Sequence, residues 1–101
     1  AGRITEAIAL FEQVLPDRIR VLGEDHPDTL TSRNNLAGAY YAVGRLEEAI
    51  TLYEQVTKDC ARILGEDHPL TKTVLENLEA ARRELAQQED SSPTEESAQE
   101  D

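Results

Sequence analysis

The sequence predicts an all-α fold, in which antiparallel helix-turn-helix repeats stack into a short right-handed α-solenoid. The main observation is self-similarity, because residues 1–42 match residues 43–84 at about half of their positions without a gap. The run Leu-Gly-Glu-Asp-His-Pro at residues 22–27, for example, returns at residues 64–69. A fixed period of this length is typical of arrays built from one repeated supersecondary unit. The second observation is that apolar residues recur at spacings of three and four, as they do along one face of a helix.

The first repeat unit contains two predicted helices, at about residues 3–22 and 28–43. Gly23 and Pro27 separate them, and Gly44 forms a tight connection to the next helix. Short connections of this kind place neighbouring helices antiparallel. Pro16 lies inside the first of these helices, where it removes a backbone donor. We therefore expect a kink at Pro16 or a helix break near Leu15.

The second unit contains predicted helices at about residues 45–64 and 69–88. Gly65 is expected to end the first of them in the left-handed conformation, and Pro69 suits the first turn of the second. Tyr40 is expected to pack inward, and Arg82 stands 42 residues after it. This exchange predicts that the last helix is a polar cap, which repeat arrays need for solubility.

The repeats therefore account for residues 1–88, and residues 89–101 differ from them in composition. This segment holds six acidic residues and no basic one, together with Ser, Pro and Thr. Such a segment buries too little apolar surface to offset its ordering entropy. We expect a disordered acidic tail, whose role is solvation or, as the alternative, regulation or partner binding.

The charge and the cysteine content exclude several classes of function. The formal net charge of -11 repels phosphate backbones and anionic lipid headgroups, so we expect no nucleic-acid or membrane partner. No apolar run approaches the roughly 18–20 residues that span a bilayer. Cys60 is the single cysteine and cannot form an internal disulfide. A reduced thiol and a cytoplasmic location are the expectation.

Two repeated clusters of polar residues could be read as metal sites. Each contains Glu, Asp and His, at residues 24–26 and 66–68, and carboxylate and imidazole groups both bind divalent ions. Each cluster also precedes a proline at a helix start, where acidic side chains satisfy free backbone N–H groups. The capping interpretation is preferred, because every repeat needs the same turn. The sequence has no phosphate-binding loop, nucleophile elbow or spaced Cys/His set. We therefore expect no metal, no cofactor and no enzymatic activity.

The pattern around the second unit resembles the tetratricopeptide repeat. The residues that carry the resemblance are Asn35-Leu36-Ala37, Tyr40, Gly44-Arg45, Glu48-Ala49 and Tyr53. The 42-residue period is similar to the longer variant found in kinesin light chains, and the resemblance covers residues 1–85. It implies a protein-interaction module, a scaffold that binds a peptide or protein segment. Similar arrays in bacterial signalling proteins suggest an alternative, a regulatory or sensor segment of a larger nucleotide-binding protein.

The resemblance also implies where a partner binds, because the first helix of each repeat lines a concave groove in such arrays. Carried onto this sequence, the groove positions are Asn34, Gly38, Tyr41, Glu76, Ala80 and Arg83, with Asn35 and Asn77 beside them. Asparagine offers a donor and an acceptor to a peptide backbone, and Tyr41 offers a rigid amphipathic contact. The alternative is that Asn35 and Asn77 satisfy only contacts between helices.

The first helix is expected to expose apolar residues that a missing partner helix would cover. The candidates are Ile4, Ile8, Phe11 and Leu15. Large uncovered apolar patches drive self-association, so we expect a homo-oligomer through this helix.

Overall fold

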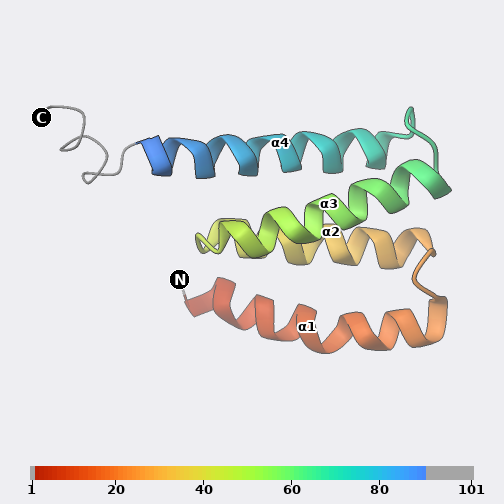
Figure 1. The fold of residues 1–101 in the computed structure, drawn as a ribbon. Coiled ribbons are helices and arrows are strands. Elements are labelled where there is room, and N and C mark those ends of the chain that lie inside the picture. The colour runs from red at the N-terminus through yellow and green to blue at the C-terminus, as the bar shows by residue number, and fades with distance from the viewer. Residues whose placement is uncertain (1, 91–101) are drawn as a thin grey trace, which may run out of the picture.

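The computed structural model describes residues 2–90, which form four consecutive α-helices. They are α1 (Gly2–Leu22), α2 (Pro27–Ala42), α3 (Leu46–Ile63) and α4 (Pro69–Asp90). Each helix runs antiparallel to the one before it and packs against it (Figure 1). The all-α prediction is confirmed for the described residues, and the helices begin and end within two residues of the predicted bounds. The predicted disordered tail falls mostly on residues 91–101, which lie outside the described part of the chain, while Glu89 and Asp90 belong to α4.

Pro16 does not interrupt the first helix. The prediction of a helix break near Leu15 is wrong, because α1 continues through this position to Leu22. The ribbon of α1 is bent in its middle part instead (Figure 1). A proline inside a helix loses one hydrogen bond and displaces the preceding turn. A bend accommodates the ring while the remaining hydrogen bonds of the helix persist.

Glycine residues end the helices, as the sequence indicates. Gly23, Gly44 and Gly65 have φ angles of 91°, 85° and 96°, the left-handed region that glycine adopts without a steric penalty. The amide of Gly65 donates to the carbonyl of Cys60 at 3.2 Å and thereby satisfies the end of α3. The prediction of a left-handed cap at Gly65 is confirmed.

The histidine of each Glu-Asp-His cluster caps the following helix. His26 Nδ1 accepts a hydrogen bond from the amide of Asp28, and His68 Nδ1 accepts one from the amide of Leu70, both at 3.0 Å. The capping interpretation was therefore right about the position. It was wrong about the acceptor, because in both clusters the imidazole takes the place of a carboxylate.

The core lies where α3 packs between α2 and α4. Leu30 and Ala37 of α2, Val56 and Cys60 of α3, and Val74 of α4 have no solvent exposure. Small side chains at Ala37 and Cys60 let the helix axes approach closely, which suits a chain with few aromatic residues. The middle helix α3 is thus covered on both sides, whereas α1 and α4 each have one covered side.

The exposed apolar face of α1 is not the predicted one. Ile8 is buried, and Ile4, Phe11 and Leu15 are half-buried. These residues lie on the side that packs on α2, so their prediction as an uncovered patch is wrong. The exposed apolar side chains of α1 are instead Leu10, Val14 and Val21, on the adjacent stripe of the same helix, and Leu22 at its C-terminal end.

Candidate protein-binding site

The predicted groove depends on α2 and α4, which touch each other at one polar contact. Asn77 Nδ2 of α4 donates a hydrogen bond to Asn34 Oδ1 of α2 at 3.3 Å, and the pair is partly buried. Partial burial takes hydrogen bonds to water away from both amides, and the bond between them replaces part of that loss. The pair therefore favours one register of α4 against α2. Asn34 and Asn77 therefore have a role in helix packing, whatever else they bind.

Gly38 and Tyr41 lie one and two turns beyond Asn34 on α2. A Cβ atom at Gly38 would lie 3.4 Å from Oη of Tyr53, close to ordinary contact distance, so α2 passes near this buried tyrosine of α3 here. Tyr41 is half-buried and packs against the core cluster. Gly38 thus serves the contact between α2 and α3, and only part of the Tyr41 side chain is available to a partner.

The predicted positions on α4 are more open to solvent. Glu76 and Arg83 are exposed and lie seven residues apart, which places them on one face of the helix. Ala80 lies between them and is half-buried. A ligand on this face would meet a carboxylate at one end and a guanidinium group at the other, with a small apolar residue between them.

Asn35 is the one predicted residue that the structure places elsewhere. Its side chain is exposed and lines a cavity of about 230 Å³ between α1 and α2, together with Leu10, Phe11 and Val14 of α1. Asn35 therefore lies beside α1, away from the contact between Asn34 and Asn77. The family resemblance implies that Asn35 lies beside the groove residue Asn34. Neighbouring residues on a helix point about 100° apart, however, so the two side chains face different helices.

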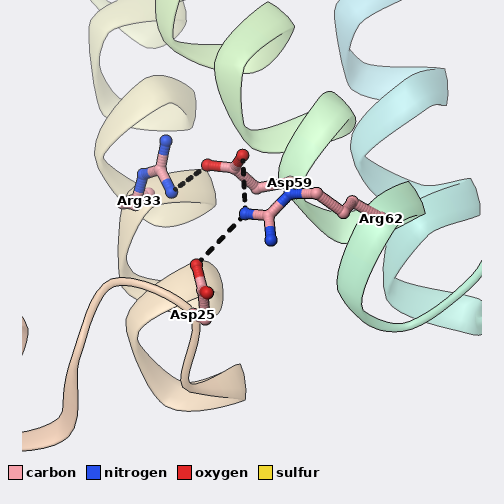
Figure 2. A network of polar contacts seen from close by, with 4 residues as sticks. All are labelled: Asp25, Arg33, Asp59 and Arg62. Atoms are coloured by element: carbon pink, nitrogen blue, oxygen red, sulfur yellow. Dashed lines mark hydrogen bonds and ion pairs between the residues drawn. The ribbon is translucent and has the colours of Figure 1, made fainter.

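A network of four charged side chains ties α2 and its preceding loop to α3 (Figure 2). Arg33 donates to Asp59 at 2.8 Å, while Arg62 donates to Asp25 at 3.2 Å and to Asp59 at 3.4 Å. Burial alone would raise the pKa of Asp59, but the hydrogen bonds and charges of Arg33 and Arg62 outweigh it and lower that pKa. This network helps to set the position of α2, and with it the positions of Asn34, Gly38 and Tyr41.

The sequence did not indicate a second groove, which lies between Leu36 and Tyr40 of α2 and residues 47–55 of α3. It has a volume of about 420 Å³, and its apolar lining comes from Leu36, Tyr40 and Leu52. The carboxylates of Glu47 and Glu48 stand at its rim. The prediction that Tyr40 packs inward holds only in part, because its ring packs against the core and also lines this groove. The tyrosine is only half-buried, with the guanidinium group of Arg45 4.6 Å from the centre of its ring.

Other kinds of site would use a reactive thiol, a cluster of metal ligands or a membrane-spanning helix. Burial raises the pKa of the Cys60 thiol, which disfavours the thiolate that a nucleophile needs. Within residues 2–90, no three side chains of His, Cys, Asp or Glu stand close enough together to hold a metal ion. In the same part of the chain, no helix is both long and apolar enough to span a bilayer.

Comparison with known proteins links this arrangement to one repeat family. The family model described as tetratricopeptide repeat matches the chain twice, over residues 1–60 and 34–100. A search of the curated proteins finds no match.

Proposed function

Because the chain belongs to the tetratricopeptide repeat family, we propose that it binds an extended peptide or protein segment along the face formed by α2 and α4. Tetratricopeptide repeats are generally protein-interaction modules. We assign the 42-residue period to the longer variant of the repeat, which kinesin light chains contain. The observation that carries the proposal is the hydrogen bond between Asn77 and Asn34, because it aligns two equivalent helices into one continuous surface.

The chemistry of this face favours a segment with polar backbone contacts and opposite charges at its two ends. Glu76 attracts a basic side chain, and Arg83 attracts a carboxylate or the C-terminus of a peptide. Between these two residues, Ala80 offers a small apolar contact, and the neighbouring helix α2 presents the exposed part of the Tyr41 ring. The face is short, so we expect weak binding of only a few residues.

A library of peptides displayed on phage tests this function without knowledge of the natural partner. Peptides selected on the immobilised chain are then titrated against the full chain and its variants by calorimetry. In the main variant, Asn34 and Tyr41 are both replaced by Ala, and we expect weaker binding with unchanged helicity. If the peptides bind this variant and the parent chain with equal affinity, the two residues do not belong to the site.

A second variant avoids any effect on packing. Because Asn34 and Tyr41 also contact other helices, Glu76→Lys combined with Arg83→Glu changes only exposed side chains on the same face. We expect a loss of affinity of about tenfold, which corresponds to about 1.4 kcal/mol. The matched control is Thr51→Ala combined with Gln55→Ala, which alters the other groove between α2 and α3. A loss of binding in the control alone would move the site to that groove.

Self-association is the second part of the proposal. Leu10, Val14 and Val21 form an exposed apolar stripe on α1, with Leu22 exposed at the end of the helix, and stripes of this kind associate in water. We expect the isolated chain to form weak oligomers through this stripe. Sedimentation velocity at rising concentration measures this, and a single monomeric species throughout the range would contradict it.

The regulatory alternative assigns the same face to a segment within a larger nucleotide-binding protein. It predicts that the natural ligand of the Asn34 face lies in the parent reading frame. The parent sequence itself is the test, because a phosphate-binding loop in that frame favours this alternative and its absence favours the interaction module.

A further inference from the structure

The exposed stripe of α1 corresponds to a covered stripe of α3. The two helices are related by 42 residues, so Leu10, Val14 and Val21 match Leu52, Val56 and Ile63. Val14 is 39% exposed, whereas Val56 has no exposure. Tyr53 and Cys60 lie on either side of Val56 on its helix face, and both approach α2, Tyr53 at Gly38 and Cys60 beside Arg33. The side of α3 that α2 covers is therefore the side that α1 leaves open.

The same stripe of α1 carries half of a charged network. Asp17 and Arg20 form an ion pair at 3.4 Å, as do their equivalents Asp59 and Arg62. In α3 this pair is completed from outside, because Asp59 accepts from Arg33 and Arg62 donates to Asp25 (Figure 2). Both side chains of the α1 pair are 72% exposed. Solvent therefore lies where Arg33 and Asp25 lie around the equivalent pair of α3.

A third polar group repeats in the same way. Asn77 of α4 donates to Asn34 of α2, and the residue that matches Asn77 in the first repeat is Asn35. Asn35 is exposed and lies at the cavity between α1 and α2, where Leu10 and Val14 form part of the wall. The three groups on α3 and α4 that hold α2 in place thus all have copies on α1 and α2.

We propose that the stripe of α1 and the adjacent Asn35 form a docking site for an amphipathic helix. This helix has the same pattern of apolar and charged side chains as α2 and the loop before it. The occupant carries an arginine that pairs with Asp17 and, next to it, an asparagine whose Oδ1 accepts from Asn35. Eight residues before the arginine, an acidic residue pairs with Arg20, as Asp25 precedes Arg33 in this chain. Its apolar side covers Leu10, Val14 and Val21. This site is separate from the proposed groove of α2 and α4 and does not depend on it.

One difference limits what the site accepts. Arg18 stands where α3 has Cys60, and its side chain lines the same cavity as Asn35. The arginine of an incoming helix therefore meets a like charge as well as Asp17. The contact with Asp17 must outweigh that repulsion, so a change of charge at Asp17 is the most sensitive probe of the site.

The test uses a synthetic peptide with the sequence of residues 23–43, which includes the Asp25, Arg33 and Asn34 positions. It is titrated into the isotope-labelled full chain, and methyl and amide shifts are followed by NMR. An isolated helix of this length is only marginally stable in water, so a method that detects weak binding is required. We expect saturable shifts at Leu10, Val14, Val21 and Asn35.

Charge reversal distinguishes specific docking from non-specific hydrophobic binding. Asp17→Arg in the chain is expected to weaken the binding of the peptide at least fivefold, and a peptide with Arg33→Asp is expected to restore it. Glu79→Lys on α4, an exposed acidic position far from α1, is the matched control and should leave the affinity unchanged.

Three outcomes would overturn the proposal. The first is the absence of shifts on α1, and the second is equal affinity for the parent chain and the Asp17→Arg variant. The third is self-association through α1 that a saturating amount of the peptide does not displace, because a helix bound at Leu10, Val14 and Val21 must compete with a second copy of the chain for the same stripe.

Discussion

Tyr40 of α2 donates its hydroxyl hydrogen to Glu12 Oε2 of α1 at 2.6 Å. The equivalent residues 42 positions later are Arg82 and Glu54, and Arg82 donates to Glu54 Oε2 at 2.7 Å. The same contact between neighbouring helices is therefore made twice, once with a phenol and once with a guanidinium group. A repeat that conserves a geometry while it changes the donor indicates that this position holds adjacent helices in register.

The first prediction concerns the ionisation of Tyr40. Burial, the hydrogen bond to Glu12 and the charge of Glu12 together raise the pKa of Tyr40 to about 12. We expect Glu12→Gln to lower the pKa of Tyr40, as followed by ultraviolet absorbance. Because this folded-state pKa lies above the ordinary value of about 10, the stabilisation is complete below that value. It is lost as the pH rises from about 10 to about 12.

The Tyr40→Phe variant is the control for this assignment. It removes the phenol whose pKa is raised to about 12 and leaves Tyr41 and Tyr53 in place. An unchanged late phase in this variant would assign the high pKa to another tyrosine.

The second prediction concerns the charged network at Asp59. Its lowered pKa means that the contribution of Asp59 to stability is complete above the ordinary range for aspartate and is lost as the pH falls through the folded-state value. We expect Asp59→Asn to lower the free energy of unfolding at neutral pH by about 1–3 kcal/mol, because the partly buried Arg33 loses the negative charge of its partner. The measurement is urea denaturation at several pH values. A variant that loses as much stability in strong acid as at neutral pH would contradict this account.

The third prediction concerns the histidine caps. His26→Ala removes the acceptor for the amide of Asp28 and is expected to cost about 1 kcal/mol of stability. His26→Asp is expected to retain most of it, because a carboxylate also accepts from the first turn. The same pair of substitutions at His68 provides an internal repeat of the experiment. Equal stability of the Ala and Asp variants at both positions would show that the caps contribute nothing.

The fourth prediction concerns Gly38, the one glycine in the interior of α2. A Cβ atom here would meet Tyr53 Oη at 3.4 Å, which is close to ordinary contact distance. Since alanine is favoured over glycine inside a helix, Gly38→Ala is expected to stabilise the chain by about 0.5–1 kcal/mol. Gly38→Leu is expected to destabilise it, since the larger side chain must displace Tyr53. Thermal unfolding measures both, and a destabilised alanine variant would show that Tyr53 cannot adjust.

Much of the fold could be predicted from residue order alone. Gly23, Gly44 and Gly65 mark the helix ends by a local conformational requirement, and the apolar spacing along 45–64 follows from helix geometry. These features depend on neighbours in the sequence. Pro16 is a borderline case, because a sequence cannot show whether the surrounding packing keeps the helix continuous.

The site could be predicted less completely, because it depends on contacts between helices. The exposed stripe at Val14 and the buried position of Ile8 lie on adjacent sides of one helix, and only the placement of α2 separates them. The choice of His26 Nδ1 over a neighbouring carboxylate depends on side-chain geometry at the cap. The 42-residue offset matches Asn35 to Asn77, but the position of Asn77 depends in turn on the packing of α4 against α2.

The most direct test of the proposed interaction function is an NMR map of the full chain with a peptide selected from the displayed library. The account predicts shift changes that cluster on Asn34, Tyr41, Glu76 and Arg83, along the face shared by α2 and α4. Shift changes confined to Leu36, Tyr40 and Leu52, in the opposite groove, would contradict it.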